Sequence, residues 1–240
     1  MNYNAFIGRN VEILFKNSVG DNPIAMSAIQ QHFMIEGRYL NSVSTGIHSE
    51  KCDVKMEFAD GHNIDANVKA YKRSAAFNQL TRASIPHFCT LFGLEYAQKD
   101  LANLFLTKAR NDRTHLFPPE AQSLWRLIFQ EVATELVYWS LSSKKSREIL
   151  AIYEREQSTM RIYAMQDVLK NLSAKVGFTS RGNMSIGRSI VVQRKGGNGV
   201  HSIHITKTDP RHPGNDIQIK MRMNLFEEEM RDKILAEYHV

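Results

Sequence analysis

The sequence predicts a mixed α/β (α+β) fold, with a central mixed β-sheet flanked by helices. Two strand-like stretches form a hairpin near residues 52–71, a helix-rich middle covers 84–173, and short alternating segments fill 175–223. Strands and helices that are grouped in this way favour one sheet with helices packed on it. The 240 residues, 42% hydrophobic and 23% charged, have the length and composition of a single domain spanning 1–240.

The first helix is predicted to begin at Pro23. Asn22 can cap the free amide groups, and Pro23 suits the first helical position. Apolar residues then recur with helical spacing up to Gly37. The preceding stretch, 1–20, contains only a short apolar run without a decisive period, so no element is assigned to it.

The hairpin consists of a strand from Cys52 to Phe58, a tight polar turn, and a strand from Asn63 to Tyr71. Asp53 opens the first strand, and Asn67 and Lys69 lie in the second. Successive side chains of a strand point to opposite faces, so Asn67 and Lys69 are expected on one side. The pattern places an oxygen ligand and an ammonium group opposite a carboxylate.

This set of groups suits a divalent metal and an attacking water. Magnesium prefers hard oxygen ligands, which the Asp53 carboxylate, the Asn67 amide and the Val68 carbonyl can supply. Such a metal lowers the pKa of bound water and neutralises charge on a phosphate, while Lys69 can stabilise that charge or orient the water. An exposed hairpin with scattered polar residues is an equally open interpretation of the spacing alone.

The rest of the chain is predicted to be helical first and then strand-rich. Helices are expected over 84–108, from Pro118-Pro119 to Leu141, over Lys144–Glu156 and over Met160–Leu172. Strands are expected at Lys175–Thr179, Arg188–Lys195, Val200–Lys207 and Asp216–Met223. The last stretch, Leu225–Tyr238, is expected to form an acidic helix.

Positive charge is concentrated in one part of the chain. Between Arg181 and Arg222 there are eight Lys or Arg residues and two acids, which gives this segment a charge of +6, equal to that of the whole chain. A local positive field of this kind indicates a polyanionic partner. A solvated basic strand face is the alternative interpretation.

The basic segment contains a second predicted hairpin, in which Arg188–Lys195 and Val200–Lys207 flank the turn Gly196-Gly197-Asn198-Gly199. The first of these strands ends in Gln193, Arg194 and Lys195, whose side chains suit the donor and acceptor edges of guanine and adenine. Gly196 and Gly197 let the backbone approach a ligand closely.

The two cysteines, Cys52 and Cys89, lie in hydrophobic surroundings and are expected to pack as small reduced residues, which indicates a cytoplasmic protein. No apolar run approaches the roughly 20 residues that span a bilayer, and the first residues resemble no signal peptide, so no membrane partner is expected.

Taken together, three stretches resemble the PD-(D/E)XK nuclease superfamily, and more narrowly its MspI-like, HinP-type group of type II restriction endonucleases. They are Asp53…Asn67-Val68-Lys69, Ala76-Phe77-Asn78-Gln79 and Gln193-Arg194-Lys195-Gly196-Gly197, with a weaker match at Gly182–Arg188. The resemblance covers about residues 45–82 and 180–226. In this group the usual second acid is an amide residue, as it is at Asn67.

The resemblance implies a restriction-endonuclease-like fold and a Mg²⁺-dependent enzyme that cuts double-stranded DNA and leaves 5′-phosphates. Asp53 and Asn67 would be metal ligands, with Lys69 completing the catalytic site. A short G/C-only palindrome, GCGC first and CCGG next, would be read from the major groove. Its readers would be Gln193, Arg194, Lys195, Gly196 and Gly197, and Asn78 and Gln79 would contact DNA near the scissile bond.

This interpretation divides the single domain into a catalytic hairpin (45–82), a helical middle (84–173), a basic DNA-reading part (175–223) and a final helix (225–238). Double-stranded DNA and a cognate DNA methyltransferase encoded nearby are the expected partners, and a homodimer is left open. Two alternatives remain: a strand-nicking repair nuclease of the same fold, and a DNA-binding module without catalysis.

Overall fold

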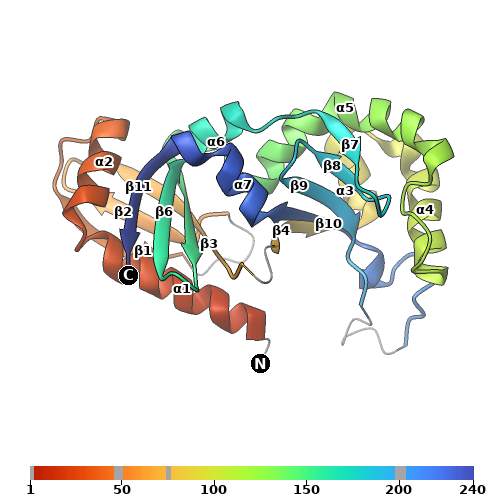
Figure 1. The fold of residues 1–240 in the computed structure, drawn as a ribbon, viewed down its shortest axis with the longest axis horizontal. Coiled ribbons are helices and arrows are strands. Elements are labelled where there is room, and N and C mark those ends of the chain that lie inside the picture. The colour runs from red at the N-terminus through yellow and green to blue at the C-terminus, as the bar shows by residue number, and fades with distance from the viewer. Residues whose placement is uncertain (1–2, 46–50, 74–76, 198–203) are drawn as a thin grey trace. The chain divides into compact units, whose positions relative to one another are not determined.

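The structure is a computed structural model that describes residues 3–45, 51–73, 77–197 and 204–240 (Figure 1). Its fold is mixed α+β, as predicted, and a mixed sheet flanked by helices is present. The described residues form two sheets, whereas one was expected. The contacts group the chain into two compact units, each built from separated stretches. Unit 1 comprises Met1–Asn78, Leu141–Leu172 and Met223–Val240, and unit 2 comprises Gln79–Ser140 and Ser173–Arg222.

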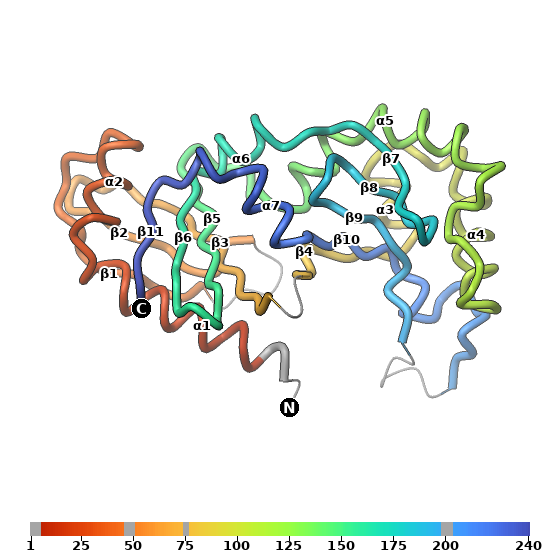
Figure 2. The backbone as a smooth tube through the Cα atoms, in the orientation of Figure 1, coloured from red at the N-terminus to blue at the C-terminus, as the bar shows by residue number. Residues whose placement is uncertain are grey.

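Unit 1 contains a six-stranded sheet in the order β1-β2-β3-β5-β6-β11. Its strands are β1 (Tyr39–Ser44), β2 (Val54–Phe58), β3 (Asn63–Tyr71), β5 (Glu148–Glu154), β6 (Thr159–Ala164) and β11 (Ile234–His239). All neighbours pair antiparallel except β3 and β5, which are parallel. Figure 2 shows in colour that the sheet combines early strands, middle strands and the late strand β11.

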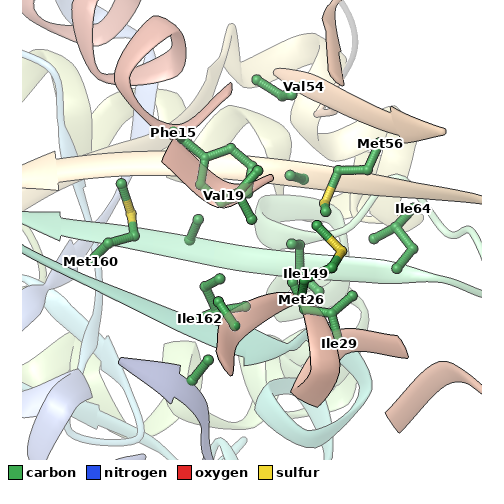
Figure 3. Close-up of a cluster of buried hydrophobic side chains, with 14 of the residues drawn as sticks. Phe15, Val19, Met26, Ile29, Val54, Met56, Ile64, Ile149, Met160 and Ile162 are labelled. Atoms are coloured by element: carbon green, nitrogen blue, oxygen red, sulfur yellow. The ribbon is translucent and has the colours of Figure 1, made fainter. Parts of the chain in front are cut away.

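Helices α1 (Tyr3–Val19) and α2 (Pro23–Phe33) contribute to the core of unit 1 on one face of this sheet. Residues Val11, Phe15 and Val19 of α1 are four apart, and all are buried in this core. The α2 helix begins as predicted, with the Asn22 side chain accepting a bond from the Ala25 amide at 2.9 Å. Figure 3 shows side chains from both helices meeting those of the strands: Phe15, Val19, Met26, Ile29, Val54, Met56, Ile64, Ile149, Met160 and Ile162.

The other face of the same sheet carries polar residues that bind α7 (Met223–Glu229). The Tyr71 hydroxyl donates to Glu227, and Arg161 pairs with Glu227 at 2.7 Å. Tyr163 packs its ring edge-on against Phe226, with centroids 5.4 Å apart. The buried Tyr163 hydroxyl has no hydrogen-bond partner among the described residues, and burial raises its pKa.

Two tyrosine substitutions on this face are expected to change stability in opposite directions. Tyr163→Phe removes an unsatisfied buried hydroxyl and should raise the free energy of unfolding by about 1 kcal/mol. Tyr71→Phe removes a hydroxyl bonded to Glu227 and should lower it by about 1–2 kcal/mol. Urea denaturation followed by circular dichroism measures both, and equal losses in the two variants would contradict the assignment.

Unit 2 contains a five-stranded sheet in the order β4-β10-β9-β8-β7. Its strands are β4 (Phe77–Ala83, which begins in unit 1), β7 (Val176–Phe178), β8 (Met184–Ile186), β9 (Ile190–Arg194) and β10 (Ile217–Arg222). Its helices are α3 (Ile85–Phe92), α4 (Gln98–Arg110) and α5 (Pro119–Leu141, whose last residue belongs to unit 1). Aromatic rings in contact hold this unit together, among them Phe88, Phe117, Phe129 and Phe178.

Several helix predictions are wrong. The stretch 144–156 contains strand β5, and 160–172 contains strand β6 before the short helix α6 (Met165–Asn171). The stretch 225–238 contains the end of α7 and most of β11. Strand β5 is buried on both faces, so its apolar residues do not alternate, and such a run is easily mistaken for a buried helix.

The second predicted hairpin is also wrong. Strand β9 has β8 on one side and β10 on the other, so both of its edges are already occupied. Residues 204–207 form turns and coil, and 198–203, which include Asn198 and Gly199 of the predicted turn, lie outside the described residues. Strand β8, which lies between Asn183 and Gly187, was not predicted.

Cys52 and Cys89 are both buried and free, as expected. None of the helices in the described ranges combines the length and apolar character needed to cross a bilayer.

Candidate functional site

The predicted hairpin forms as β2 and β3, and three of its residues meet at one point. The Asp53 amide donates to the Ala66 carbonyl at 2.9 Å, which fixes Asp53 beside β3. Its carboxylate oxygen Oδ2 accepts from the Val68 amide at 2.7 Å and from Lys69 Nζ at 3.4 Å. Lys69 Nζ also donates to the Val68 carbonyl at 3.2 Å. Both charged side chains stay in partial contact with solvent, at 23% exposure for Asp53 and 17% for Lys69.

Asn67 lies on the same face of β3 as Lys69, as predicted from the strand period. The residues between and before them, Ala66 and Val68, point into the hydrophobic core. Asn67 is 5% exposed, and its Nδ2 donates to the Leu141 carbonyl at 3.0 Å. Its Oδ1 is buried and accepts no hydrogen bond from any described residue. The amide oxygen is therefore left for another ligand, because buried acceptors are normally satisfied.

The chemistry of these donors fits a magnesium ion. One carboxylate, one amide oxygen and one backbone carbonyl are all hard oxygen donors. Within the described part of the chain, no group of three or more His, Cys, Asp or Glu side chains is placed to hold a metal ion. A metal at this hairpin would therefore depend on Asp53, Asn67 and Val68, and would draw its remaining oxygens from water or a bound phosphate.

The loop that follows α5 helps to fix the position of the Asn67 side chain. It folds around the buried Glu148 carboxylate, which accepts from the Ser143 amide at 2.8 Å and the Lys145 amide at 3.1 Å, and from the Ser142 hydroxyl. Lys144 adopts a left-handed conformation (φ 65°) to complete the turn. The loop begins directly after Leu141, whose carbonyl binds Asn67, so Glu148 indirectly fixes this side chain.

Lys51 is a site residue that the motif did not indicate. Burial, together with the positive charge of Lys69, lowers the pKa of Lys51 to about 8, while Asp53 acts in the opposite direction. The hairpin thus presents two lysines beside one carboxylate. In the sequence, the only signal for Lys51 was its position two residues before Asp53.

Asn78 and Gln79, at the start of β4, belong to different units. The Asn78 Nδ2 donates to the Ala70 carbonyl at 2.9 Å, which holds this side chain against the end of β3 in unit 1. Gln79 is exposed in unit 2, and its Oε1 accepts from Gln218 Nε2 at 2.5 Å. Ala76, quoted in the same motif, lies outside the described residues.

The predicted DNA-reading residues lie in unit 2 at the end of β9, where Gln193 and Arg194 point to opposite faces of the sheet. Gln193 Nε2 donates to Gln218 Oε1 at 3.1 Å. Arg194 Nε donates to Asn215 Oδ1 at 2.8 Å, and its buried Nη2 has no partner in the described ranges. Burial lowers the pKa of Arg194, and the charge of Asp112 opposes this shift.

Beyond β9 the chain turns through glycines. Lys195 donates its backbone amide to the Asp216 carbonyl at 3.0 Å, and Gly196 donates to the Gly214 carbonyl at 2.9 Å. Gly196 and Gly197 have φ values of 70° and 74°, in the region that favours glycine. The two glycines thus follow an unusual backbone path directly after the basic residues.

The fold described here is that of the restriction endonucleases. A similar solved structure is the restriction endonuclease MspI in complex with its cognate DNA, with a TM-score of 0.51 and 15% identity over 90% of this chain and 87% of that chain. No protein-family model matches the sequence, and no curated protein matches it. At this identity the likeness shows a shared fold.

Proposed function

We propose that this chain is a type II restriction endonuclease of the MspI-like, HinP-type group. It hydrolyses phosphodiester bonds of double-stranded DNA with Mg²⁺, leaves 5′-phosphates, and acts at a short G/C-only palindrome, with GCGC favoured and CCGG next. The convergence of Asp53, Val68 and Lys69 on one hairpin supports this proposal most strongly, because it combines a metal-binding carboxylate with an ammonium group in a fold that a DNA-bound restriction endonuclease shares.

Each catalytic group has a defined task in this proposal. Asp53, Asn67 and the Val68 carbonyl would hold the metal, which when bound would lower the pKa of a water ligand and neutralise phosphate charge. Lys69, held by two oxygens at 3.2 and 3.4 Å, orients the attacking water or stabilises the charge that develops on phosphate. Only one carboxylate serves the metal, so its affinity is weak until DNA phosphate is bound.

The reading groups lie in the basic part of unit 2. Gln193, Arg194 and Lys195, with the turn at Gly196 and Gly197, contact base edges, and Asn78 and Gln79 contact DNA near the scissile bond. The unpartnered Nη2 of Arg194 is a donor that a guanine acceptor would satisfy. A palindromic target suits two copies of the chain related by two-fold symmetry, and a cognate methyltransferase encoded nearby would protect host DNA.

The test is a digest of DNA of known sequence with and without Mg²⁺. We expect discrete fragments with 5′-phosphate ends from the unaltered protein, and no fragments from Asp53→Ala or when EDTA removes the metal. Binding should weaken steeply with salt, because each neutralised phosphate releases counterions. Mismatch-dependent nicking would instead favour a repair nuclease.

The alternative of a non-catalytic DNA-binding module draws support from the absence of an acidic cluster in the described ranges. It requires that the unaltered protein and Asp53→Ala leave DNA equally intact at every Mg²⁺ concentration while both still bind it. Any magnesium-dependent cleavage that the substitution removes contradicts this alternative.

A further inference from the structure

A row of three glutamines crosses three neighbouring strands of unit 2. Gln79 lies on β4, Gln218 on β10 and Gln193 on β9, and β10 is the middle strand of the three. Gln218 stands directly opposite Gln193 in the register of β10 and β9. Gln218 is 6% exposed, whereas Gln79 is exposed and Gln193 half-buried. Gln218, the central residue of the row, is therefore the most buried of the three.

Both the oxygen and the nitrogen of the Gln218 amide form hydrogen bonds with the neighbouring glutamines. Its Oε1 accepts from Gln193 Nε2 at 3.1 Å, and its Nε2 donates to Gln79 Oε1 at 2.5 Å. An amide has one oxygen acceptor and one nitrogen with two donors. Among the described residues these bonds leave the NH₂ group of Gln79, and the oxygen and one N–H of Gln193, for another partner. With the Gln218 amide fixed, a half-turn of either flanking amide would break its bond to this buried partner, which costs more than an exposed bond.

We propose that Gln218 is a positioning residue that determines which hydrogen-bonding group Gln79 and Gln193 present to DNA bases. This inference rests on the proposed function, in which both flanking glutamines contact DNA. Guanine offers the acceptors O6 and N7 in the major groove, and cytosine offers the N4 donor. The donor group of Gln79 then matches guanine, and the oxygen of Gln193 matches cytosine. Gln218 itself is covered and contacts no base.

The substitution Gln218→Glu tests this assignment because an ionised carboxylate only accepts hydrogen bonds. Gln193 already donates to this position, so it keeps its orientation. Gln79 must turn its NH₂ group inward and present its oxygen. We expect the base preference at the position that Gln79 reads to shift from guanine to cytosine or adenine by about tenfold, and the preference at the position that Gln193 reads to stay.

Gln218→Met provides the second variant, since it removes both hydrogen bonds at similar volume. Both flanking amides then rotate freely, and discrimination should weaken at both positions. Gln130→Glu is the matched control, because the Gln130 amide also makes two hydrogen bonds within unit 2, to the Ala174 carbonyl and from the Val176 amide. It should leave every base preference unchanged.

The experiment selects bound duplexes from a randomised pool without Mg²⁺ and sequences them. If the unaltered protein selects no sequence, the proposed function fails and this inference fails with it. If it selects a site and Gln218→Glu selects the same site with the same base ratios, only the inference is overturned. A uniform loss of affinity with unchanged ratios also overturns it. Circular dichroism confirms that each variant folds, and if Gln218→Glu does not, Gln218→Met decides by the same criteria.

Discussion

Replacing Lys69 with alanine is expected to lower the rate of DNA cleavage by roughly 10²–10⁴-fold and to leave sequence-specific binding intact. Lys69 Nζ lies 3.4 Å from Asp53 Oδ2 and 3.2 Å from the Val68 carbonyl, so its charge is fixed beside the proposed metal ligands. In the proposed mechanism its removal takes away the group that acts on the attacking water and the phosphate. Supercoiled plasmid cleavage measures the rate, and a gel shift without Mg²⁺ measures binding.

Lys170→Ala is the control for this prediction, because Lys170 is an exposed lysine on α6 of the same unit. It changes the net charge by the same amount and should retain the cleavage rate within about twofold, since exposed charges contribute little on their own. Comparable cleavage by Lys69→Ala and Lys170→Ala would remove Lys69 from the catalytic site and would return the hairpin to a structural role.

Replacing Glu148 with alanine is expected to lower the free energy of unfolding by about 3 kcal/mol or more, because hydrogen bonds to a charged group contribute strongly and their donors become unpaired. The carboxylate accepts from two backbone amides and the Ser142 hydroxyl in a buried loop. The melting temperature should fall by about 6–12 °C. Differential scanning fluorimetry gives this shift directly.

The same variant should also lose cleavage at temperatures where it is still folded, because the Glu148 loop positions the Leu141 carbonyl that holds Asn67. Glu36→Ala is the control: Glu36 is exposed in unit 1, and its loss should change stability by less than about 0.5 kcal/mol. A Glu148→Ala protein as stable as the control would show that the loop holds its conformation without the carboxylate.

The sequence was most informative where apolar and polar residues alternate along an element. Strands β2 and β3 were predicted with nearly correct bounds, because core and polar residues alternate along them. The start of α2 followed from Asn22 and Pro23, whose effects on a helix are local. Local rules of this kind need no knowledge of the rest of the fold.

Where both faces of an element carry apolar residues, the same reasoning failed. Strand β5 carries apolar residues without alternation because β3 and β6 flank it and both of its faces are covered. In contrast, α1 did carry a signal: Val11, Phe15 and Val19 are four apart, but the apolar Ile13 and Leu14 between the first two obscured the period. Strand β11 was not predicted, because it lies in an acidic stretch whose composition is typical of a helix.

In the candidate site, too, local features could be predicted from the sequence and long-range contacts could not. The shared face of Asn67 and Lys69 followed from the strand period, and it is confirmed. The hydrogen bond from Asn67 to the Leu141 carbonyl could not be predicted, and neither could the bonds of the Gln218 amide to Gln79 and Gln193. The paired residues are 74, 139 and 25 positions apart in the sequence. Long-range contacts of this kind depend on the complete topology.

The parallel pairing of β3 with β5 also bears on the synthesis of this protein. The ribosome makes the hairpin that carries Asp53 and Lys69 early, but the strand that pairs with β3 begins only at Glu148, after the first stretch of unit 2. The far edge of the sheet is added later still, by β11. A chain that ends before β5 therefore holds the Asp53 carboxylate and the Lys69 ammonium without the loop that fixes Asn67. We expect nascent chains that end before β5 to be inactive in DNA cleavage.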